Sequence, residues 1–215
     1  MAKTITKRQL DALNLIYQNT KSSGFPPSMA EMRDALSVAS NQSIINLLKA
    51  LEEKGCIKRE EGLARGLKIL PKGFSVLGVD PIVPVVGQSS CGPFIEATQE
   101  IGNWTVLPGI TNEVQESQDK IFAIQVCGDS MINAGIYDGD MLLVKQTREF
   151  KNGDIVVARS DDGTTVKRFV AENKRAYLKP ENPAYKNIPI FEETYFDGKV
   201  IANLSTLKRM YEPKN

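Results

Sequence analysis

The chain has 215 residues and a net charge of only +1, and its 41% hydrophobic and 25% charged residues are typical of a globular protein, not a disordered one. No apolar run reaches the ~18–20 residues that a membrane span needs, and the N-terminus lacks the apolar core of a signal peptide, so we expect a cytoplasmic protein. The three cysteines, odd in number and without a CxxC pair, argue against a disulfide framework and a zinc site, and we expect no metal and no cofactor.

Two capping boxes predict helix starts near the N-terminus. In Thr6–Gln9 and Ser28–Glu31, the hydroxyl can accept from the third helical N–H while the last side chain reaches back. The first helix carries one apolar face at helical spacing and ends at Gly24. The second follows a Pro-Pro pair and ends near Leu36, so two helices are expected before residue 40.

A third helix is predicted from Ser40 to Gly55, because its apolar residues again recur at helical spacing. Residues 56–60 and 66–70 then have the pattern of a short hairpin around Gly62. Three helices followed by a two-stranded hairpin indicate a winged helix-turn-helix, which binds DNA. A generic helical domain with charged faces is the alternative.

The charge distribution agrees with DNA binding by the first third of the chain. Residues 1–70 contain 11 Lys and Arg against 7 Asp and Glu, whereas the remainder contains 16 against 19. In a winged helix-turn-helix the third helix enters the major groove by its N-terminal residues, and the wing follows the backbone. The candidates for base contacts are Ser40, Asn41, Gln42, Ser43 and Asn46, and those for phosphate contacts are Arg65 and Lys68 in the wing, with Lys58 and Arg59.

Residues 71–81 mix Pro, Gly and apolar residues without periodicity, and we interpret them as a linker between domains at 1–70 and 82–215. The next stretch, residues 84–94, opens with two valines suited to a strand and continues with Gly and Ser. From the spacing of its residues alone, we expect this stretch to be a surface loop. Residues 104–118 show no regular pattern.

The last part of the chain contains short β-rich runs separated by Gly, Asn and Asp. Strands this short with turn signals between them predict a compact, mostly-β domain. The runs are residues 121–126, 141–144, 155–158, 164–170, 176–178 and 200–207.

Ser130 lies in the stretch CGDSMINAGIYDGDMLLV, at the end of a predicted strand and among small or turn-forming residues. A serine there can present its hydroxyl to a carbonyl and leave backbone N–H groups to hold an oxyanion. An ordinary Gly-Asp-Ser turn is the alternative. The chain contains no histidine, so a Ser-His-Asp triad is impossible and a nucleophilic serine needs another base.

Lys167, 37 residues downstream on a predicted strand, is the candidate base. Burial among apolar neighbours would lower its pKa, and a neutral amine can accept the proton of a serine hydroxyl. The alternative is an exposed strand lysine beside Arg168.

The motifs GDSM, DGD and TVKR, in this order, resemble the LexA/UmuD family of self-cleaving Ser-Lys peptidases. The N-terminal stretches PPS, LLKALEEKG and RGLKIL extend the resemblance to nearly the whole chain. The resemblance implies two domains, an N-terminal winged helix-turn-helix (α+β) and a C-terminal mostly-β LexA-like peptidase domain. It also implies that Ser130 is the nucleophile and Lys167 the general base.

The same resemblance assigns the scissile bond to Cys91-Gly92, because an Ala-Gly or Cys-Gly pair occupies this loop in the family. A small residue followed by glycine fits a narrow cleft. The implied function is an SOS-type repressor that binds operator DNA through its N-terminal domains and forms a homodimer through its C-terminal domain. Such a repressor cleaves itself when stimulated by RecA filaments on single-stranded DNA. The alternatives are a phage-type repressor with the same peptidase domain, a regulator whose peptidase fold is only structural, and a signal peptidase.

Overall fold

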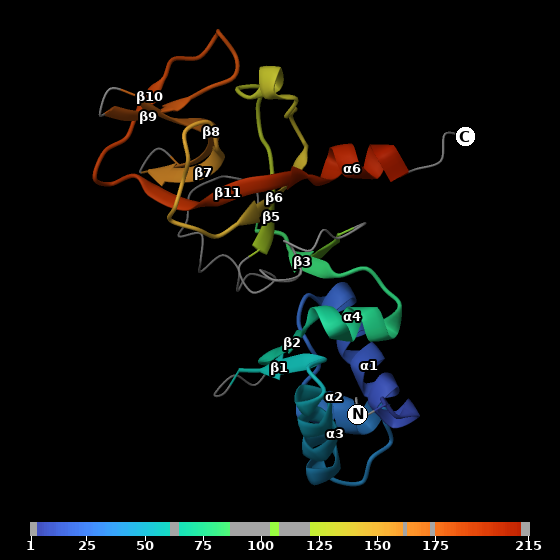
Figure 1. Cartoon of the computed structure of the whole chain (residues 1–215). Helices are drawn as coiled ribbons and strands as arrows, with labels where there is room; N and C mark the ends of the chain where they lie inside the picture. The colour runs from blue at the N-terminus through green and yellow to red at the C-terminus, as the bar shows by residue number, and fades with distance from the viewer. Residues whose placement is uncertain are drawn as a thin grey trace. The chain divides into compact units, whose positions relative to one another are not determined.

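The computed structural model describes residues 4–60, 65–86, 104–107, 121–160, 163–172 and 175–211. By its internal contacts the chain forms two compact units (Figure 1). The N-terminal unit contains residues 1–83 together with 101–118, and the C-terminal unit contains 84–100 together with 119–215. The N-terminal unit is therefore built from two separate stretches of chain.

The N-terminal unit begins with the predicted three helices and hairpin. Both capping boxes are present, and Ser40 caps the third helix by accepting from the Ser43 N–H at 3.3 Å. The elements are α1 (Lys7–Ser23), α2 (Met29–Ala35), α3 (Asn41–Glu53), β1 (Ile57–Arg59) and the antiparallel β2 (Leu67–Ile69). They enclose a core of Ala12, Leu13, Ile16, Met32, Ile44, Leu48, Leu51, Cys56 and Ile57. This arrangement of three helices and a wing confirms the predicted winged helix-turn-helix.

The segment interpreted as an irregular linker contains a helix, α4 (Pro71–Leu77). Proline is compatible with the first turn of a helix, and Gly78 ends it in the left-handed conformation at φ +66°. Phe74 is buried and packs edge-on against Tyr17, with ring centroids 6.1 Å apart. The linker interpretation is therefore wrong for residues 71–77, because seven residues are too few for helical periodicity to be recognised.

A two-stranded sheet of β3 (Ile82–Pro84) and β4 (Trp104–Val106) adjoins this helix. Sequence analysis found no regular pattern in residues 104–118, yet β4 pairs with a strand about 20 residues before it in the chain. Trp104 donates its indole N–H to the carbonyl of Gly24, at 2.7 Å, after the end of α1. The pairing is tertiary, and a strand of three residues has no sequence signature of its own.

The C-terminal unit is an antiparallel seven-stranded sheet in the order β10-β9-β8-β7-β11-β6-β5 (Figure 1), which confirms the predicted mostly-β domain. Its strands are β5 (Ile121–Gln125), β6 (Met141–Lys145), β7 (Ile155–Ser160), β8 (Gly163–Glu172), β9 (Arg175–Lys179), β10 (Ile188–Pro189) and β11 (Tyr195–Asn203). A short 3-10 helix, η3 (Ile132–Ala134), follows the turn after β5.

The strand predicted over residues 200–207 is wrong beyond residue 203, where α6 (Leu204–Tyr211) begins. The side chain of Asn203 accepts from the N–H groups of Ser205 and Thr206 and so caps the new helix. Within the described ranges, no helix combines the length and the apolarity needed to cross a membrane.

Gly198 lies on β11 between its two neighbours β6 and β7, beside a shift of register in the pairing of β11 with β7. A Cβ atom at this position would lie 2.3 Å from the carbonyl oxygen of Lys145, and a backbone atom cannot move away as a side chain can. We expect Gly198→Ala to lower the free energy of unfolding by roughly 1–3 kcal/mol, measured by denaturant titration of the full chain. Ala176→Val, which adds bulk at an exposed position on β9, is the control and should change stability by less than about 0.5 kcal/mol. Equal stabilities for both variants would contradict the steric argument.

Candidate functional site

The turn after β5 holds Ser130 at the edge of the sheet's core. Gly128 has φ +89°, a left-handed conformation that favours glycine, and the N–H of Gly128 donates to Asp138 Oδ1 at 2.7 Å. Met131, the residue after the serine, is 1% exposed within the main apolar cluster of this unit. The buried methionine and the glycine turn together fix the position of the half-buried Ser130.

Lys167 reaches Ser130 from β8. Its Nζ lies 2.7 Å from Ser130 Oγ, 2.6 Å from Thr165 Oγ1 and 2.9 Å from the carbonyl oxygen of Val166. The residue is only 6% exposed, and burial lowers its pKa to about 8, because desolvation disfavours the charged amine. The structure therefore brings together the two residues that the sequence singled out, and the predicted burial of the lysine is present.

The residue before the serine, Asp129, is held by two side chains that sequence analysis did not identify. The hydroxyl of Tyr185 donates to Asp129 Oδ1 at 2.5 Å, and the amide of Asn182 donates to both Asp129 O and Asp129 Oδ2, at 3.1 and 3.2 Å. The hydrogen bond to this carboxylate raises the pKa of Tyr185. Nearby, the N–H of Asn133 donates to the carbonyl of Glu181 at 2.9 Å. The only signal in the sequence was the Pro-Glu-Asn turn at residues 180–182.

The DGD motif stabilises the other side of the same turn. Asp140 is 4% exposed, and its Oδ2 accepts from the Tyr137 N–H at 3.0 Å and from Asn203 Nδ2 at 2.8 Å. With Asp138 bound to the Gly128 N–H, both carboxylates of the motif serve the turn's geometry. The two aspartates of the motif therefore help to hold the turn that carries Ser130.

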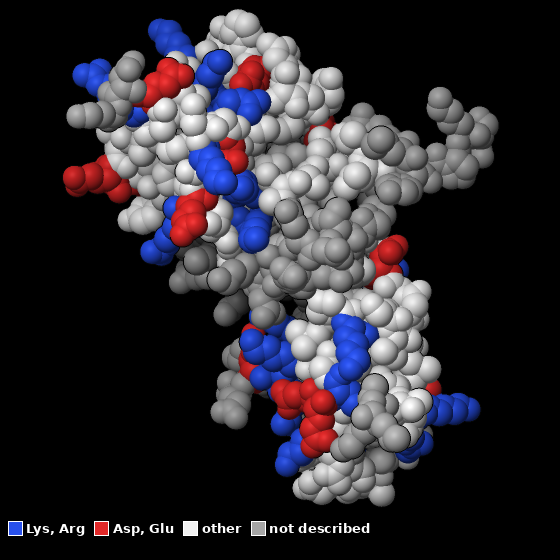
Figure 2. Space-filling view, viewed as in Figure 1, with Lys and Arg blue, Asp and Glu red and all other residues white. Residues whose placement is uncertain are grey.

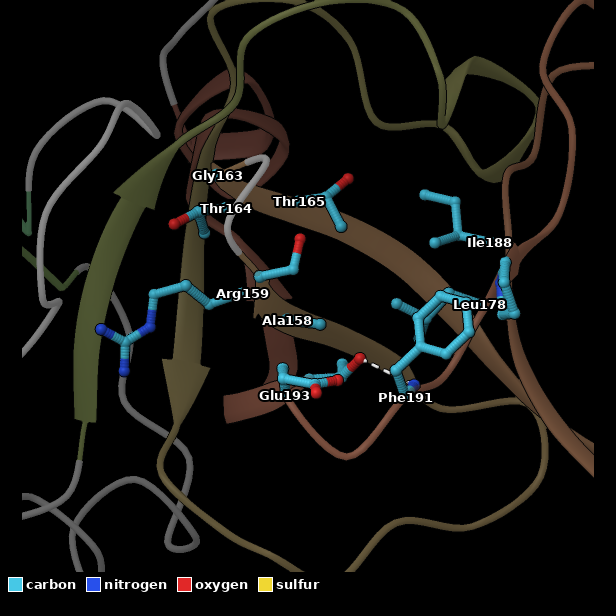
Figure 3. A pocket seen from close by; sticks show the side chains of 12 residues that line it. Ala158, Arg159, Gly163, Thr164, Thr165, Leu178, Ile188, Phe191 and Glu193 are labelled. Atoms are coloured by element: carbon cyan, nitrogen blue, oxygen red, sulfur yellow. Dashed lines mark hydrogen bonds between the residues drawn. The ribbon is translucent and has the colours of Figure 1, made fainter.

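A cavity of about 500 Å³ is lined by residues of β7, β8, β9 and β10 and of the segment that follows β10 (Figure 3). Thr165, which contacts Lys167, also lines the cavity, whereas Ser130 and Lys167 are not part of its lining. Its apolar lining includes Leu178, Ile188 and Phe191, and Phe191 is 63% exposed. An open, partly apolar depression of this kind can accept an apolar side chain of a bound peptide.

The arrangement can perform nucleophilic acyl transfer. It provides a serine hydroxyl, an amine of lowered pKa in contact with it, and a cavity for a substrate. Among the described residues, no group of three or more His, Cys, Asp or Glu side chains could hold a metal ion. The predicted scissile pair, Cys91 and Gly92, lies outside the described residues, and its assignment remains a prediction.

A second candidate site is the N-terminal half of α3. Asn41, Gln42 and Asn46 are exposed there, and Gln42 donates its amide to Asn46 Oδ1 at 3.0 Å. The hydroxyls of Ser40 and Ser43 lie 3.1 Å apart within the helix cap, so their first role is in the helix itself. The amides are therefore better placed than the serines to reach base edges.

The wing cations predicted to contact phosphates are paired within the protein. Arg65 donates to Glu31 Oε1 at 3.1 Å and to the Pro26 carbonyl at 3.0 Å, with its guanidinium 4.2 Å from the Phe25 ring centroid. Lys68 pairs with Glu60 at 2.7 Å. Figure 2 shows acidic side chains beside basic ones on the visible face of this unit. Arg65 therefore joins the wing to α2 and to the loop before it, whereas the Lys68–Glu60 pair lies within the wing itself.

Comparison with known proteins assigns a family to each of the two parts of the chain. Residues 2–66 match the LexA DNA binding domain, and residues 84–201 match the Peptidase S24-like family. The LexA repressor of Bacillus subtilis is 38% identical over 205 residues, which cover 94% of this chain and 98% of that protein. Those of a Geobacillus species and of Enterococcus faecalis are 38% and 34% identical, with 92% and 94% of this chain covered and 95% of each relative.

The burial of Lys167 predicts a pH-dependent effect on stability. Below pH about 8 its amine is charged in the folded protein despite being desolvated, whereas the unfolded chain holds the same proton up to pH ~10.4. The unfolded state thus binds more protons between these values, and stability rises with pH across this window. We expect Lys167→Met to stabilise the protein by roughly 1–3 kcal/mol at pH 7, with a gain that shrinks as pH rises toward 10.

Denaturant titrations at several pH values measure this effect. Lys179→Met, at an exposed position on β9, is the matched control and should give no comparable gain. A destabilised Lys167→Met protein at pH 7, or a gain that is the same at every pH, would contradict the desolvation argument.

Proposed function

This chain belongs to the LexA repressor family, and from this premise we propose that it is an SOS-type transcriptional repressor that binds operator DNA as a dimer and inactivates itself by cleaving its own backbone. The observation that carries the proposal is the 2.7 Å contact between Ser130 Oγ and Lys167 Nζ, with the amine buried and its pKa lowered to about 8. We place such a repressor in the cytoplasm.

Lys167 acts as the general base in its neutral form. A neutral amine has two hydrogens and one lone pair, and Thr165 Oγ1 and the Val166 carbonyl can accept the two hydrogens. The lone pair then faces the Ser130 hydroxyl. With a pKa of about 8, roughly one lysine in ten is neutral at pH 7, so the base is available without a partner but not abundant.

Ser130 attacks the carbonyl carbon of Cys91 as its proton passes to Lys167. Within the described part of the chain, no acceptor takes the backbone N–H of Ser130 or of Met131, and these groups can hold the oxyanion. The Lys167 ammonium then gives the proton to the departing amine of Gly92, which leaves an ester between Cys91 and Ser130. Water, activated by the same lysine, hydrolyses the ester and restores the serine.

The substrate is tethered to the enzyme, so its effective concentration is high and control must act on docking or on the charge of Lys167. The cavity beside Thr165 supports docking of an apolar side chain near the scissile bond. RecA filaments on single-stranded DNA would activate cleavage by shifting the population toward the docked form.

For DNA binding, α3 enters the major groove and Asn41, Gln42 and Asn46 contact base edges, while Ser40, Ser43, Arg65 and Lys68 are the further candidates for contact. Gln and Asn amides can bind adenine through two hydrogen bonds. The C-terminal units hold the dimer together, and linking two half-sites raises affinity by ~10²–10⁴. The hairpin wing of β1 and β2 favours this function over a phage-type repressor, which usually carries a helical DNA-binding domain without the wing.

The rate of self-cleavage in the absence of any partner tests the Ser-Lys pair. We expect it to rise roughly tenfold per pH unit below pH about 8 and to level off above, because only the deprotonated amine accepts the proton. Intact-mass measurement under denaturing conditions detects fragments 1–91 and 92–215. Ser130→Ala should remain uncut at every pH while binding DNA normally, and Lys167→Met should lose the pH-dependent rise. A pH-independent rate in the unmodified protein, or cleavage in Ser130→Ala, would refute the assignment.

Substitutions on α3 test the proposed DNA interface. The probe is a DNA fragment selected by the unmodified protein from a random library. We expect Gln42→Ala and Asn46→Ala each to weaken binding to this fragment by roughly 1–3 kcal/mol and to leave binding to unselected DNA nearly unchanged. Gln18→Ala, an exposed change on α1, is the control. An equal loss of affinity for selected and for unselected DNA would contradict base recognition by these amides. It would indicate instead that they contact phosphates or support the fold.

A further inference from the structure

The N-terminal unit is completed by a strand that lies beyond the proposed scissile bond. β3 and its neighbours precede residue 91 in the chain, whereas β4, Trp104–Val106, follows residue 92. The compact unit accordingly includes residues 101–118 as well as 1–83. A cut at Cys91-Gly92 would therefore divide this unit between two fragments.

The contacts that hold β4 are apolar and hydrogen-bonded. Trp104 and Val106 pack against Tyr17, Phe74 and Ile82, whose exposed fractions are 4%, 3% and 3%. The Trp104 indole donates to the Gly24 carbonyl at 2.7 Å.

Beyond the strand, Leu107 is also buried, and its N–H donates to the Pro81 carbonyl at 2.8 Å. Every one of these partners belongs to the fragment before the cut.

We propose that self-cleavage first produces a nicked complex, in which β4 of fragment 92–215 stays docked on fragment 1–91. The proposal rests on the proposed cleavage at Cys91-Gly92. Separation would expose the cluster of Tyr17, Phe74 and Ile82 to water and break the β3–β4 pairing, and both costs oppose undocking after the bond is cut. The site is thus an interaction surface on the N-terminal unit, and its partner is the other fragment of the same chain.

The area that β4 buries against fragment 1–91 is nevertheless small. Stable protein–protein interfaces bury about 1,200–2,000 Å², far more than four residues can provide. Once the covalent link is lost, the contact becomes bimolecular and depends on concentration. Release of the DNA-binding fragment then has two steps, cleavage and undocking, and dilution drives the second.

The chain's single tryptophan reports the docking directly, because Trp104 is that residue. Undocking moves the indole from contact with an apolar cluster into water, which shifts its emission to longer wavelength. The protein is cleaved by incubation at alkaline pH, returned to neutral pH, and examined by tryptophan fluorescence and native mass spectrometry. Both measurements are repeated after about a thousandfold dilution from the micromolar range.

Two matched variants of β4 separate docking from other effects of the cut. Val106 contacts the cluster, and Thr105 points to the opposite face of the strand, as successive strand residues do. Val106→Asp places a charge against the cluster, whereas Thr105→Asp places the same charge away from it. Circular dichroism of the uncut variants checks that both are folded.

We expect the cleaved parent and the cleaved Thr105→Asp protein to keep the emission of the intact chain and to appear as a two-fragment complex before dilution. After dilution their emission shifts and the fragments separate. Cleaved Val106→Asp should be separated at both concentrations. The proposal is overturned if the cleaved parent is already separated before dilution, or if Val106→Asp retains the complex as the parent does.

A failure of the proposed function is visible separately, because an uncut chain keeps its full mass under denaturing conditions. In that case the bond is cut externally, in a Ser130→Ala chain with an endoprotease recognition sequence inserted between Cys91 and Gly92. The same fluorescence and mass measurements then test the docking of β4 without any self-cleavage.

Discussion

The proposed self-cleavage of this protein depends on one buried lysine amine. Lys167 is 6% exposed and lies 2.7 Å from Ser130 Oγ, and the burial lowers its pKa to about 8. In water the same amine would be almost entirely protonated at neutral pH and could accept nothing. Burial of the Lys167 amine destabilises the folded protein, but it also makes the amine partly neutral at pH 7. Because the chain contains no histidine, a neutral lysine is the candidate base for activating the serine.

The rest of the C-terminal unit serves to hold this contact in place. The strand pairing of β7 with β8 sets Lys167 opposite Val156, while buried Met131 fixes the serine's side of the contact. Asp129 is bound by Tyr185 and Asn182, which come from a turn more than 50 residues further along the chain. A contact between two atoms thus requires three distant segments to fold together, which a rigid sheet achieves and a flexible loop would not.

The N-terminal unit shows how tertiary packing changes the role of charged residues. Arg65 and Lys68 have the composition and place in the wing expected of phosphate-binding residues, but each is paired with a glutamate. Exposed pairs of this kind contribute little to stability and can exchange partners. In the proposed complex with DNA, phosphate groups would compete with these carboxylates for the same cations.

The sequence alone was sufficient to predict most of the local structures and to select the two residues of the proposed Ser-Lys pair. Capping boxes, helical periodicity and alternating strands are local patterns, so they predicted α1 to α3, the wing and most of the sheet. Ser130 and Lys167 were singled out because the motifs GDSM and TVKR resemble those of the LexA/UmuD family, and the absence of histidine made the lysine the candidate base.

The tertiary structure alone decided which segments meet. It placed Asn182 and Tyr185 beside the serine's turn, paired the wing cations with acidic residues, and returned β4 to a unit whose first stretch ends at residue 83. Such contacts are long-range, and each is decided by the free energy of packing whole faces together. No window of neighbouring residues contains that information.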